Sequence, residues 1–300
     1  MKILLLGKNG QVGWELQRAL APVGELVALD RDGAEGLCGD LADLNGLRRT
    51  VRKVQPDVIV NAAAYTAVDK AEGETEKAFQ INADAPQLLA DEMQRLGGWL
   101  VHYSTDYVFD GTGDTPWRET DTPAPLNSYG KGKLQGEMAI QASGCKHLIF
   151  RTSWVYGAHG NNFAKTMLRL AGERDHLKVI DDQIGAPTGA DLLADISAHA
   201  LRRAIANPEL KGLYHLTASG ETSWFDYASF IINSASAHGI DLKVQSISPI
   251  ATSAYPTSAQ RPRNSRLSTK KLEANFGFYL PIWQKGITRL LKEVSGKRND

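Results

Sequence analysis

The sequence has no excess of either charge, no long apolar runs and only two cysteines. Lys plus Arg equals Asp plus Glu, 34 of each in 300 residues, so no overall field attracts nucleic acid or an anionic membrane, and local groups must hold any anionic ligand. No segment approaches the roughly 20 apolar residues of a membrane helix. The apolar run at 3–6 is too short for a signal peptide and ends in a glycine turn. We therefore expect a cytoplasmic protein with neither nucleic acid nor membrane as a partner.

Cysteine occurs only twice, as Cys38 and Cys145, far apart in the sequence. The two form no metal-ligand spacing, and we expect reduced thiols that contribute to packing. The remaining composition, 42% hydrophobic and 23% charged, is that of an ordinary globular protein. The length suffices for one large domain or two moderate ones.

Short apolar runs alternate with helical patterns in the first half of the chain. Fully apolar strands separated by helices indicate a parallel sheet covered on both faces. With right-handed crossovers this predicts an α/β fold with a Rossmann-type, doubly wound sheet. The expected strands are 3–6, 25–30, a short one before Asp40, 58–63, 99–108 and 147–155, and the expected helices are 12–20, 44–54, 75–96 and 129–142.

The second half is less regular. Residues 190–218 read as a helix followed by a strand, which adds one more unit to the main sheet, whereas 246–264, rich in Ser, Thr and Pro, should be loop or edge strand. We therefore expect a dinucleotide-binding domain at 1–157 plus about 186–218, and a smaller, interleaved substrate domain at about 158–185 and 219–296, with a tail at 297–300. The other expected helices are 162–174, 224–238 and 283–294.

Three glycines, Gly7, Gly10 and Gly13, follow the first strand. Glycine lets the backbone turn tightly and lets a pyrophosphate approach the amides at a helix N-terminus, although a strand–helix turn with incidental glycines is the plainer alternative. Asp30 ends the second strand, where a carboxylate accepts hydrogen bonds from an adenosine ribose. Arg31 beside it can instead pair with a 2′-phosphate. The motif predicts a nicotinamide dinucleotide and leaves NADH and NADPH both open.

Small and polar residues follow two further strands. Asp40 and Leu41 can border the adenine, although Asp40 reads almost equally well as a solvated loop residue. The alanines at 62–64 leave room for a cofactor across the strand tips, and Tyr65 and Thr66 follow at the same rim.

Tyr129 and Lys133 stand four residues apart in S-Y-G-K-G-K, so they share one face of a helix. An ammonium beside a phenol favours its ionised form, and we expect it to lower the pKa of Tyr129, which is about 10 when unperturbed. That would give an acid able to protonate a carbonyl oxygen near neutral pH. A surface pair is the usual alternative, but the position between two sheet strands favours catalysis.

Ser104, Thr105 and Asp106 end the strand at 99–108. Thr105 can donate a hydrogen bond to the carbonyl oxygen that Tyr129 would protonate. Asp106 can bind a sugar hydroxyl, or it can cap the following turn.

With these residues in view, the chain resembles the extended short-chain dehydrogenase/reductases over 2–294. More narrowly, it resembles the members that reduce dTDP-4-keto-6-deoxy sugars. The matching segments are G-K-N-G-Q-V-G at 7–13, P-D-V-I-V-N-A-A-A-Y-T-A-V-D-K-A-E at 56–72, S-T-D-Y-V-F at 104–109, P-L-N-S-Y-G-K-G-K at 125–133, R-T-S-W-V-Y-G at 151–157, D-Q-I-G-A-P-T-G at 182–189 and R-P-R-N-S-R-L at 261–267.

The resemblance implies a role for each matching position. Tyr129 would be the proton donor, Lys133 its partner and a ligand of the nicotinamide ribose, and Thr105 would tune proton transfer. Thr105, Asp106, Tyr129, Trp154 and Arg261 would contact the sugar nucleotide. The cofactor would contact Gly7, Gly10, Gln11, Val12, Gly13, Asp30, Arg31, Asp40, Leu41, Ala63, Ala64, Tyr65, Thr66, Tyr103 and Lys133.

The resemblance also implies groups outside the reacting centre. Some members of the family hold Mg²⁺ at a homodimer contact built from carboxylates, and the matching positions are Glu15, Asp191 and Glu293. Cations from the second domain would meet the substrate diphosphate. The candidates are Lys165, Arg261, Arg263 and Arg266, because basic side chains, and the Arg fork above all, pair with phosphate oxygens.

Two other functions remain open on the sequence alone. An NAD-dependent sugar-nucleotide epimerase would use the same residues, whereas a dehydratase would need a Glu beside Asp106, where this chain has Tyr107. A non-catalytic, NADP-binding regulatory subunit would not need the Tyr129–Lys133 pair.

Overall fold

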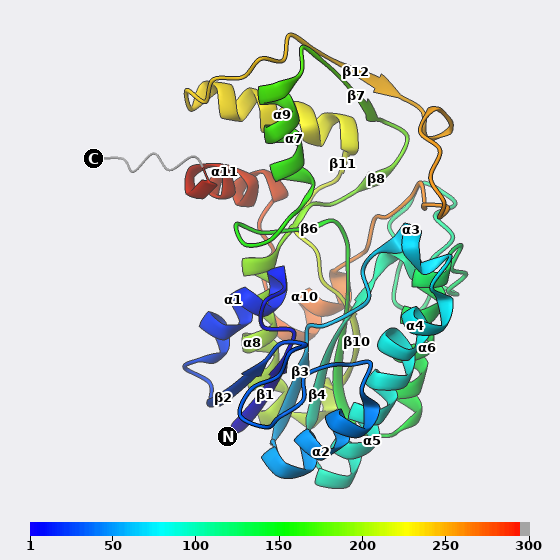
Figure 1. Ribbon diagram of the computed structural model, residues 1–300, viewed down its shortest axis with the longest axis vertical. Helices are drawn as coiled ribbons and strands as arrows, with labels where there is room; N and C mark the ends of the chain where they lie inside the picture. Colours follow the sequence, from blue (N-terminus) through cyan, green and yellow to red (C-terminus); the bar gives the residue numbers. More distant parts are fainter. Residues whose placement is uncertain (295–300) are drawn as a thin grey trace.

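A six-stranded parallel sheet forms the lower part of the molecule (Figure 1). The computed structural model describes residues 1–294, and the strand order is β10-β5-β4-β3-β1-β2 with every neighbouring pair parallel. The strands are β1 Lys2–Leu6, β2 Glu25–Leu29, β3 Val58–Asn61, β4 Trp99–Thr105, β5 Lys146–Thr152 and β10 Gly212–His215. The predicted doubly wound α/β fold is confirmed.

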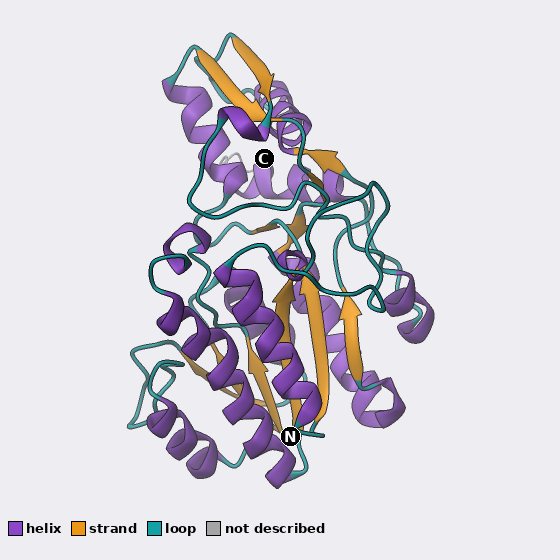
Figure 2. Cartoon of the chain, turned by 90° about the vertical axis from the view of Figure 1, so that its right-hand side faces the viewer, coloured by secondary structure: helices purple, strands orange, loops and turns teal. Residues whose placement is uncertain are grey.

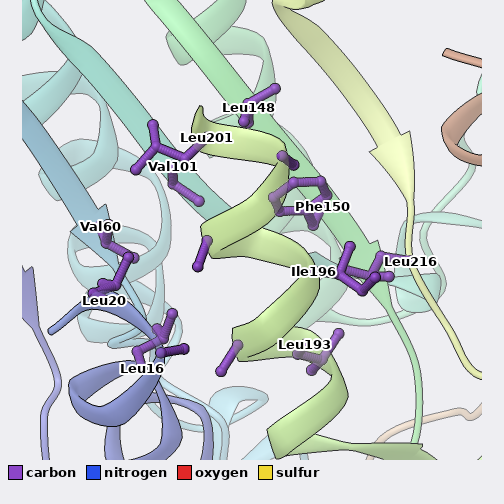
Figure 3. Packing of buried hydrophobic residues seen from close by; sticks show 14 of the residues in the cluster. Leu16, Leu20, Val60, Val101, Leu148, Phe150, Leu193, Ile196, Leu201 and Leu216 are labelled. Atoms are coloured by element: carbon purple, nitrogen blue, oxygen red, sulfur yellow. The ribbon is translucent and has the colours of Figure 1, made fainter. Parts of the chain in front are cut away.

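Helices cover both faces of this sheet (Figure 2). One face packs against α1 Gln11–Leu20, α8 Ala190–Ala206 and α10 Lys270–Phe276, and the other against α2 Leu44–Val54, α5 Ala85–Leu96 and α6 Ser128–Ala142. Leu16 and Leu193, from α1 and α8, meet Val60, Val101 and strand residues beside them in the first of these cores (Figure 3). Burying one such side chain contributes roughly 1.5–3 kcal/mol, so the sheet is a rigid platform for whatever its edge carries.

The expected helix at 75–96 is interrupted. Helix α4 Thr75–Phe79 runs into a π-helical turn at Gln80–Asp84 before α5 begins. Pro86 stands in the first turn of α5 and has no N–H to donate, so the regular ladder cannot pass through it. The turn carries Asn82, whose side chain bonds both the N–H and the carbonyl of Tyr65, at 2.9 Å and 3.0 Å. The π turn thus fixes the segment that follows β3.

The expected short strand before Asp40 is wrong. Only an isolated bridge joins Ala34 to Leu37 there. Gly33 and Gly36 have φ of +71° and +72°, in the left-handed region, so the backbone turns instead of extending.

The other elements gather above the sheet (Figure 1). They include α9, which the pattern at 224–238 predicts, and β12, an edge strand that pairs in parallel with β7 within the Ser- and Pro-rich segment. The predicted helix and strand at 190–218 are α8 and β10, and β10 joins β5 in the main sheet. These elements are α3 Val68–Ala71, β6 Val155–Tyr156, α7 Phe163–Glu173, β7 His176–Ile180, β8 Ile184–Gly185, β9 Thr188–Gly189, β11 Thr222–Ser223, α9 Trp224–Ala237, β12 Ser246–Ile250 and α11 Trp283–Val294.

The division into two domains stays a prediction, and residues 295–296 and the tail at 297–300 lie outside the described residues. Across residues 1–294, none of the helices combines the length and the apolar character that a membrane span requires.

Candidate active site

The residues singled out in the sequence meet at one edge of the sheet. All strands of the sheet are parallel, so the turns after β1, β2, β3 and β4 come to the same side. The N-terminus of α1 begins at this edge, and Tyr129 stands in the first turn of α6.

The glycine turn after β1 is built on a close backbone contact. A Cβ on Gly13 would lie 1.9 Å from the Gly7 carbonyl oxygen, and one on Gly7, whose φ is +87°, would lie 2.8 Å from the Ala63 nitrogen. Gly10 has room, its nearest such neighbour being 3.4 Å away. Gly7 and Gly13 therefore serve packing, while Gly10 caps α1 and leaves the helix N-terminus accessible. Gln11 and Val12 follow in the first turn of α1.

Asp30 lies at the end of β2 as predicted. Its Oδ2 accepts a hydrogen bond of 2.6 Å from Asn9 Nδ2, and Lys8 Nζ lies 3.7 Å from the same oxygen. Its Oδ1 is buried without a partner among the described residues. Arg31 is exposed. One carboxylate oxygen thus remains for a ribose hydroxyl, with two basic side chains close in sequence or space.

The candidate cofactor residues after β3 and before α2 differ in how deeply they are buried. Asp40 accepts a hydrogen bond from the Ala42 N–H, as a turn-capping residue does, and Leu41 is buried in the core. The alanines at 62–64 are half-buried, and Thr66 is exposed.

Tyr103 on β4 donates its hydroxyl hydrogen to Ser197 Oγ of α8 at 2.7 Å. The phenol of Tyr103 therefore has a partner within the fold.

Thr105, Asp106 and Tyr129 form one cluster where β4 ends. Thr105 Oγ1 donates to Asp106 Oδ1 at 3.2 Å and accepts from the Tyr107 N–H at 3.1 Å. Thr105 and the Tyr129 phenol are also joined by a hydrogen bond, and the ring of Tyr107 packs edge-on to that of Tyr129, with centroids 5.8 Å apart. The predicted approach of Tyr129 to Thr105 is present.

The carboxyl group of Asp106 is buried, with 3% of the residue exposed. Burial raises its pKa to about 7, against hydrogen bonds from Ser265 and Thr105 that lower it. Its Oδ2 has no partner among residues 1–294. A buried, unpartnered oxygen beside Thr105 suits a hydroxyl-bearing ligand.

The expectation that the Tyr129 phenol has a lowered pKa is wrong. Burial raises the pKa of Tyr129 to about 12, Thr105 lowers it, and the Asp106 charge raises it further. Lys133 does not act on it, because its Nζ is directed to β4, 2.6 Å from the Tyr103 carbonyl oxygen and 3.1 Å from His102 Nε2. A phenol with a raised pKa remains protonated over the whole neutral range and so carries a proton to donate, but it is a weaker acid than one whose pKa lies near the working pH.

Trp154 has an unusual backbone and a stacked ring. Its φ is +49°, and its ring lies on that of Trp224 with centroids 3.6 Å apart. A Cβ on Gly185 would lie 2.6 Å from Trp154 Cε2, so the ring also lies against the backbone of β8. The stack holds this half-buried tryptophan in one orientation.

The four candidate cations for a diphosphate are all engaged. Arg261 pairs with Asp69 at 2.6 Å, Arg263 lies 3.7 Å from Asp182, and Arg266 lies 3.6 Å from Glu221. Lys165 donates to the carbonyl oxygens of residues 158 and 160, each at 2.7 Å. A diphosphate would have to displace or share these partners.

The three candidate metal ligands do line one cavity of about 270 Å³, together with Arg18 and Arg289. Arg289 lies 3.2 Å from Asp191 and 2.9 Å from Glu293, and Arg18 lies 3.4 Å from Glu15. Within the described part of the chain, no group of three acidic, His or Cys side chains is arranged to bind a metal. The residues of a single chain therefore do not fit Mg²⁺, because arginines already neutralise the carboxylates.

The sequence reasoning missed His102 and Asn61. Asn61 Nδ2 lies 3.2 Å from His102 Nδ1, and the other ring nitrogen meets Lys133. A histidine inside an apolar strand, three residues before Thr105, is the signal that could have been noticed.

Comparison with known proteins gives the same family. Residues 1–295 match the model of the RmlD substrate binding domain. The dTDP-4-dehydrorhamnose reductase of Salmonella typhimurium is 59% identical over 98% of both chains. A dTDP-4-dehydrorhamnose reductase structure from Clostridium acetobutylicum superposes with a TM-score of 0.89 at 36% identity, covering 98% of this chain and 100% of that one. One from Bacillus anthracis, in complex with NADP, has a TM-score of 0.86 at 35% identity, covering 97% and 99%. This chain belongs to the RmlD substrate binding domain family.

Proposed function

We propose that this protein is a dTDP-4-dehydrorhamnose reductase, which reduces the C4 ketone of dTDP-6-deoxy-L-lyxo-4-hexulose and yields dTDP-L-rhamnose. Full-length identity of 59% to an enzyme of that name supports the assignment. The single structural observation that carries it is the cluster of Tyr129, Thr105 and Asp106 at the sheet edge where the glycine turn also lies.

NADPH or NADH supplies the hydride when bound. Gly10 and the N-terminus of α1 would hold the pyrophosphate, and the unpartnered Oδ1 of Asp30 would accept a hydrogen bond from the adenosine ribose. Lys8, whose Nζ lies 3.7 Å from Asp30, and Arg31, next to Asp30 in the sequence, would pair with a 2′-phosphate, so we propose that both coenzymes are used.

Side chains of this protein supply the proton, stabilise the anion that remains and bind the sugar. Tyr129 donates its hydroxyl proton to the C4 oxygen, and Thr105 turns its one hydroxyl hydrogen from Asp106 to that oxygen and polarises it. The ammonium of Lys133, one turn along α6, would stabilise the tyrosinate left behind once its Nζ turns away from the Tyr103 carbonyl oxygen. Asp106 Oδ2 binds a sugar hydroxyl, and Trp154 lies against the sugar.

The test mixes the protein with NADPH or NADH and a panel of nucleotide 4-ketosugars and follows the absorbance of the reduced nicotinamide. Tyr129→Phe should lower turnover by about 10²–10⁴-fold and keep coenzyme affinity. Tyr255→Phe, which changes an exposed tyrosine, is the matched control. Near-normal turnover of Tyr129→Phe contradicts the assignment. Turnover without net loss of NADPH would mean an epimerase, and no activity together with a stable protein partner would mean a regulatory subunit.

We further propose a cytoplasmic homodimer. Trp14 is half exposed, stacks on His159 at 4.3 Å and lines the same cavity as Arg18 and Arg289. Both cysteines are free, which suits a reducing compartment. Light scattering should show the mass of a dimer, and a chelator should leave it unchanged because the carboxylates are paired with arginine.

A further inference from the structure

The buried amine of Lys133 is held by β4. Its Nζ lies 2.6 Å from the Tyr103 carbonyl oxygen and 3.1 Å from His102 Nε2. Lys133 and His102 are only 2% and 1% exposed, so water does not complete this contact. An ammonium can only donate hydrogen bonds, whereas a neutral amine can also accept one through its lone pair. The direction of the His102–Lys133 bond therefore depends on the charge of Lys133.

Asn61 decides that direction. The N–H of Ala63 donates to Asn61 Oδ1 at 3.2 Å, which fixes the amide with its oxygen toward Ala63. Asn61 Nδ2 then faces His102 Nδ1, also at 3.2 Å. An amide nitrogen only donates, so Nδ1 must accept. In a neutral imidazole the proton then sits on Nε2, which points at Lys133.

We propose that Asn61 and His102 are positioning residues that favour the neutral amine of Lys133 over its ammonium form in the free enzyme. The chain of donors runs from the Ala63 N–H through Asn61 and His102 to the lone pair of Lys133, whose own N–H goes to the Tyr103 carbonyl. Protonating Lys133 would set two donors against each other across the His102 contact, unless the Asn61 amide turned over and lost its bond with Ala63. The role in catalysis rests on the proposed function, because it assumes that Lys133 is the partner of Tyr129.

The surrounding charges agree with this arrangement. Burial lowers the pKa of Lys133 to about 8, although Glu137 one turn along α6 raises it. Burial also lowers the pKa of His102 well below its usual value, so the imidazole is neutral. Arg151 of β5 is paired with Glu137.

The remaining titratable groups of the packed elements face elsewhere. Asp106 follows β4 directly and acts on Tyr107 and Tyr129, and Asp84 of the π turn is exposed. His102 and Glu137 are thus the titratable groups that act on Lys133.

The consequence is a pH dependence with a defined sign. Below the pKa of Lys133 the ammonium forms and can stabilise the Tyr129 anion. Above it the neutral amine, bonded to His102, gives no such support, so kcat should fall as pH rises through about 8.

The test reads the ionisation of Lys133 without using activity. Protein labelled with ¹³C-lysine is titrated by NMR from about pH 6 to about pH 11, and the Lys133 Cε resonance is identified by its loss in Lys133→Met. The wild-type midpoint should lie near 8. In Asn61→Asp a carboxylate accepts from both Ala63 and His102 Nδ1, which frees Nε2 to accept from an ammonium. The midpoint should then rise by about one pH unit or more.

A second variant without added charge and a control make the test decisive, because the new carboxylate of Asn61→Asp also attracts an ammonium by its charge. His102→Leu removes the donor that faces Lys133 and adds no charge, so the midpoint should again rise. His147→Gln changes another buried histidine, on β5, whose ring bonds the Cys145 carbonyl, and it should leave the Lys133 midpoint unchanged.

A wild-type midpoint above about 10, or one that His102→Leu does not raise, overturns the proposal. Failure of the proposed function is separate, because a protein without reductase activity can still give the expected NMR titration. An active enzyme whose Lys133 midpoint does not respond to His102→Leu would sink only the inference about Asn61 and His102.

Discussion

Arg151 and Glu137 form an ion pair inside the molecule, with 2.6 Å between Nη2 and Oε2 and side chains that are 4% and 0% exposed. Arg151 Nε also donates to both carboxylate oxygens, at 2.9 Å and 3.2 Å. The pair joins α6 to β5, so the helix that carries Tyr129 and Lys133 is anchored to the sheet one turn beyond its functional face.

Removing one partner of this ion pair should destabilise the folded protein. Glu137→Ala leaves a buried guanidinium without its counter-ion, and we expect the free energy of unfolding to fall by about 3–5 kcal/mol. The measurement is urea unfolding at neutral pH. The double variant Glu137→Leu/Arg151→Met removes both charges and should lose less than the single one. A single variant within about 1 kcal/mol of wild type would show that the pair is not buried in solution.

The glycine turn predicts a contrast between two substitutions. Gly13→Ala places a Cβ 1.9 Å from the Gly7 carbonyl oxygen, so α1 must move away from β1. The free energy of unfolding should fall by about 2 kcal/mol or more, as in other overpacked cores. Gly10→Ala meets its nearest such atom at 3.4 Å and should keep its stability while binding NADPH more weakly. Thermal melts and a coenzyme titration separate the two. Equal losses of stability would contradict the close contact.

Most of the fold could be predicted from the sequence, because short, fully apolar segments that end in glycine turns indicate the buried strands of a parallel sheet. Tyr129 and Thr105 were also brought together by an argument of topology alone, since both follow from where β4 and α6 begin or end. The charge state of Lys133 was not predictable in this way. It depends on Asn61 and His102, which come from two different strands and contact each other only after the sheet forms.

The ion pairs of the candidate cations could not be predicted from the sequence either, because their partners come close only in the folded protein. Arg261 meets Asp69 across 192 positions of sequence, and no local pattern marks such a contact. The π turn at Gln80–Asp84 was missed because the apolar periodicity on either side of it is helical.

Asp106 makes stability depend on pH. Its folded pKa of about 7 lies above the ordinary aspartate pKa of 3.8, so between these values the folded protein holds a proton that the unfolded chain has released. The stabilisation is complete below the unfolded pKa and is lost as pH rises through about 7. Relative to Asp106→Asn, wild type should therefore lose roughly 2–3 kcal/mol of unfolding free energy between about pH 5 and about pH 8. Urea midpoints of both proteins across this range test it, and parallel curves would exclude the raised pKa.

The stack of Trp154 on Trp224 depends on the absence of a side chain at Gly185. A Cβ there would stand 2.6 Å from Trp154 Cε2, and because Trp154 is already held at a positive φ its ring cannot shift freely. Gly185→Ala should therefore separate the two indoles, abolish the coupled near-ultraviolet circular dichroism of two rings 3.6 Å apart, and raise KM for the sugar nucleotide more than it lowers kcat. Gly172→Ala is the matched control, because that glycine lies in α7 with open space around it and should stabilise the protein by up to about 1 kcal/mol. An unchanged dichroism spectrum in Gly185→Ala would mean that Trp154 does not rest on β8 in solution.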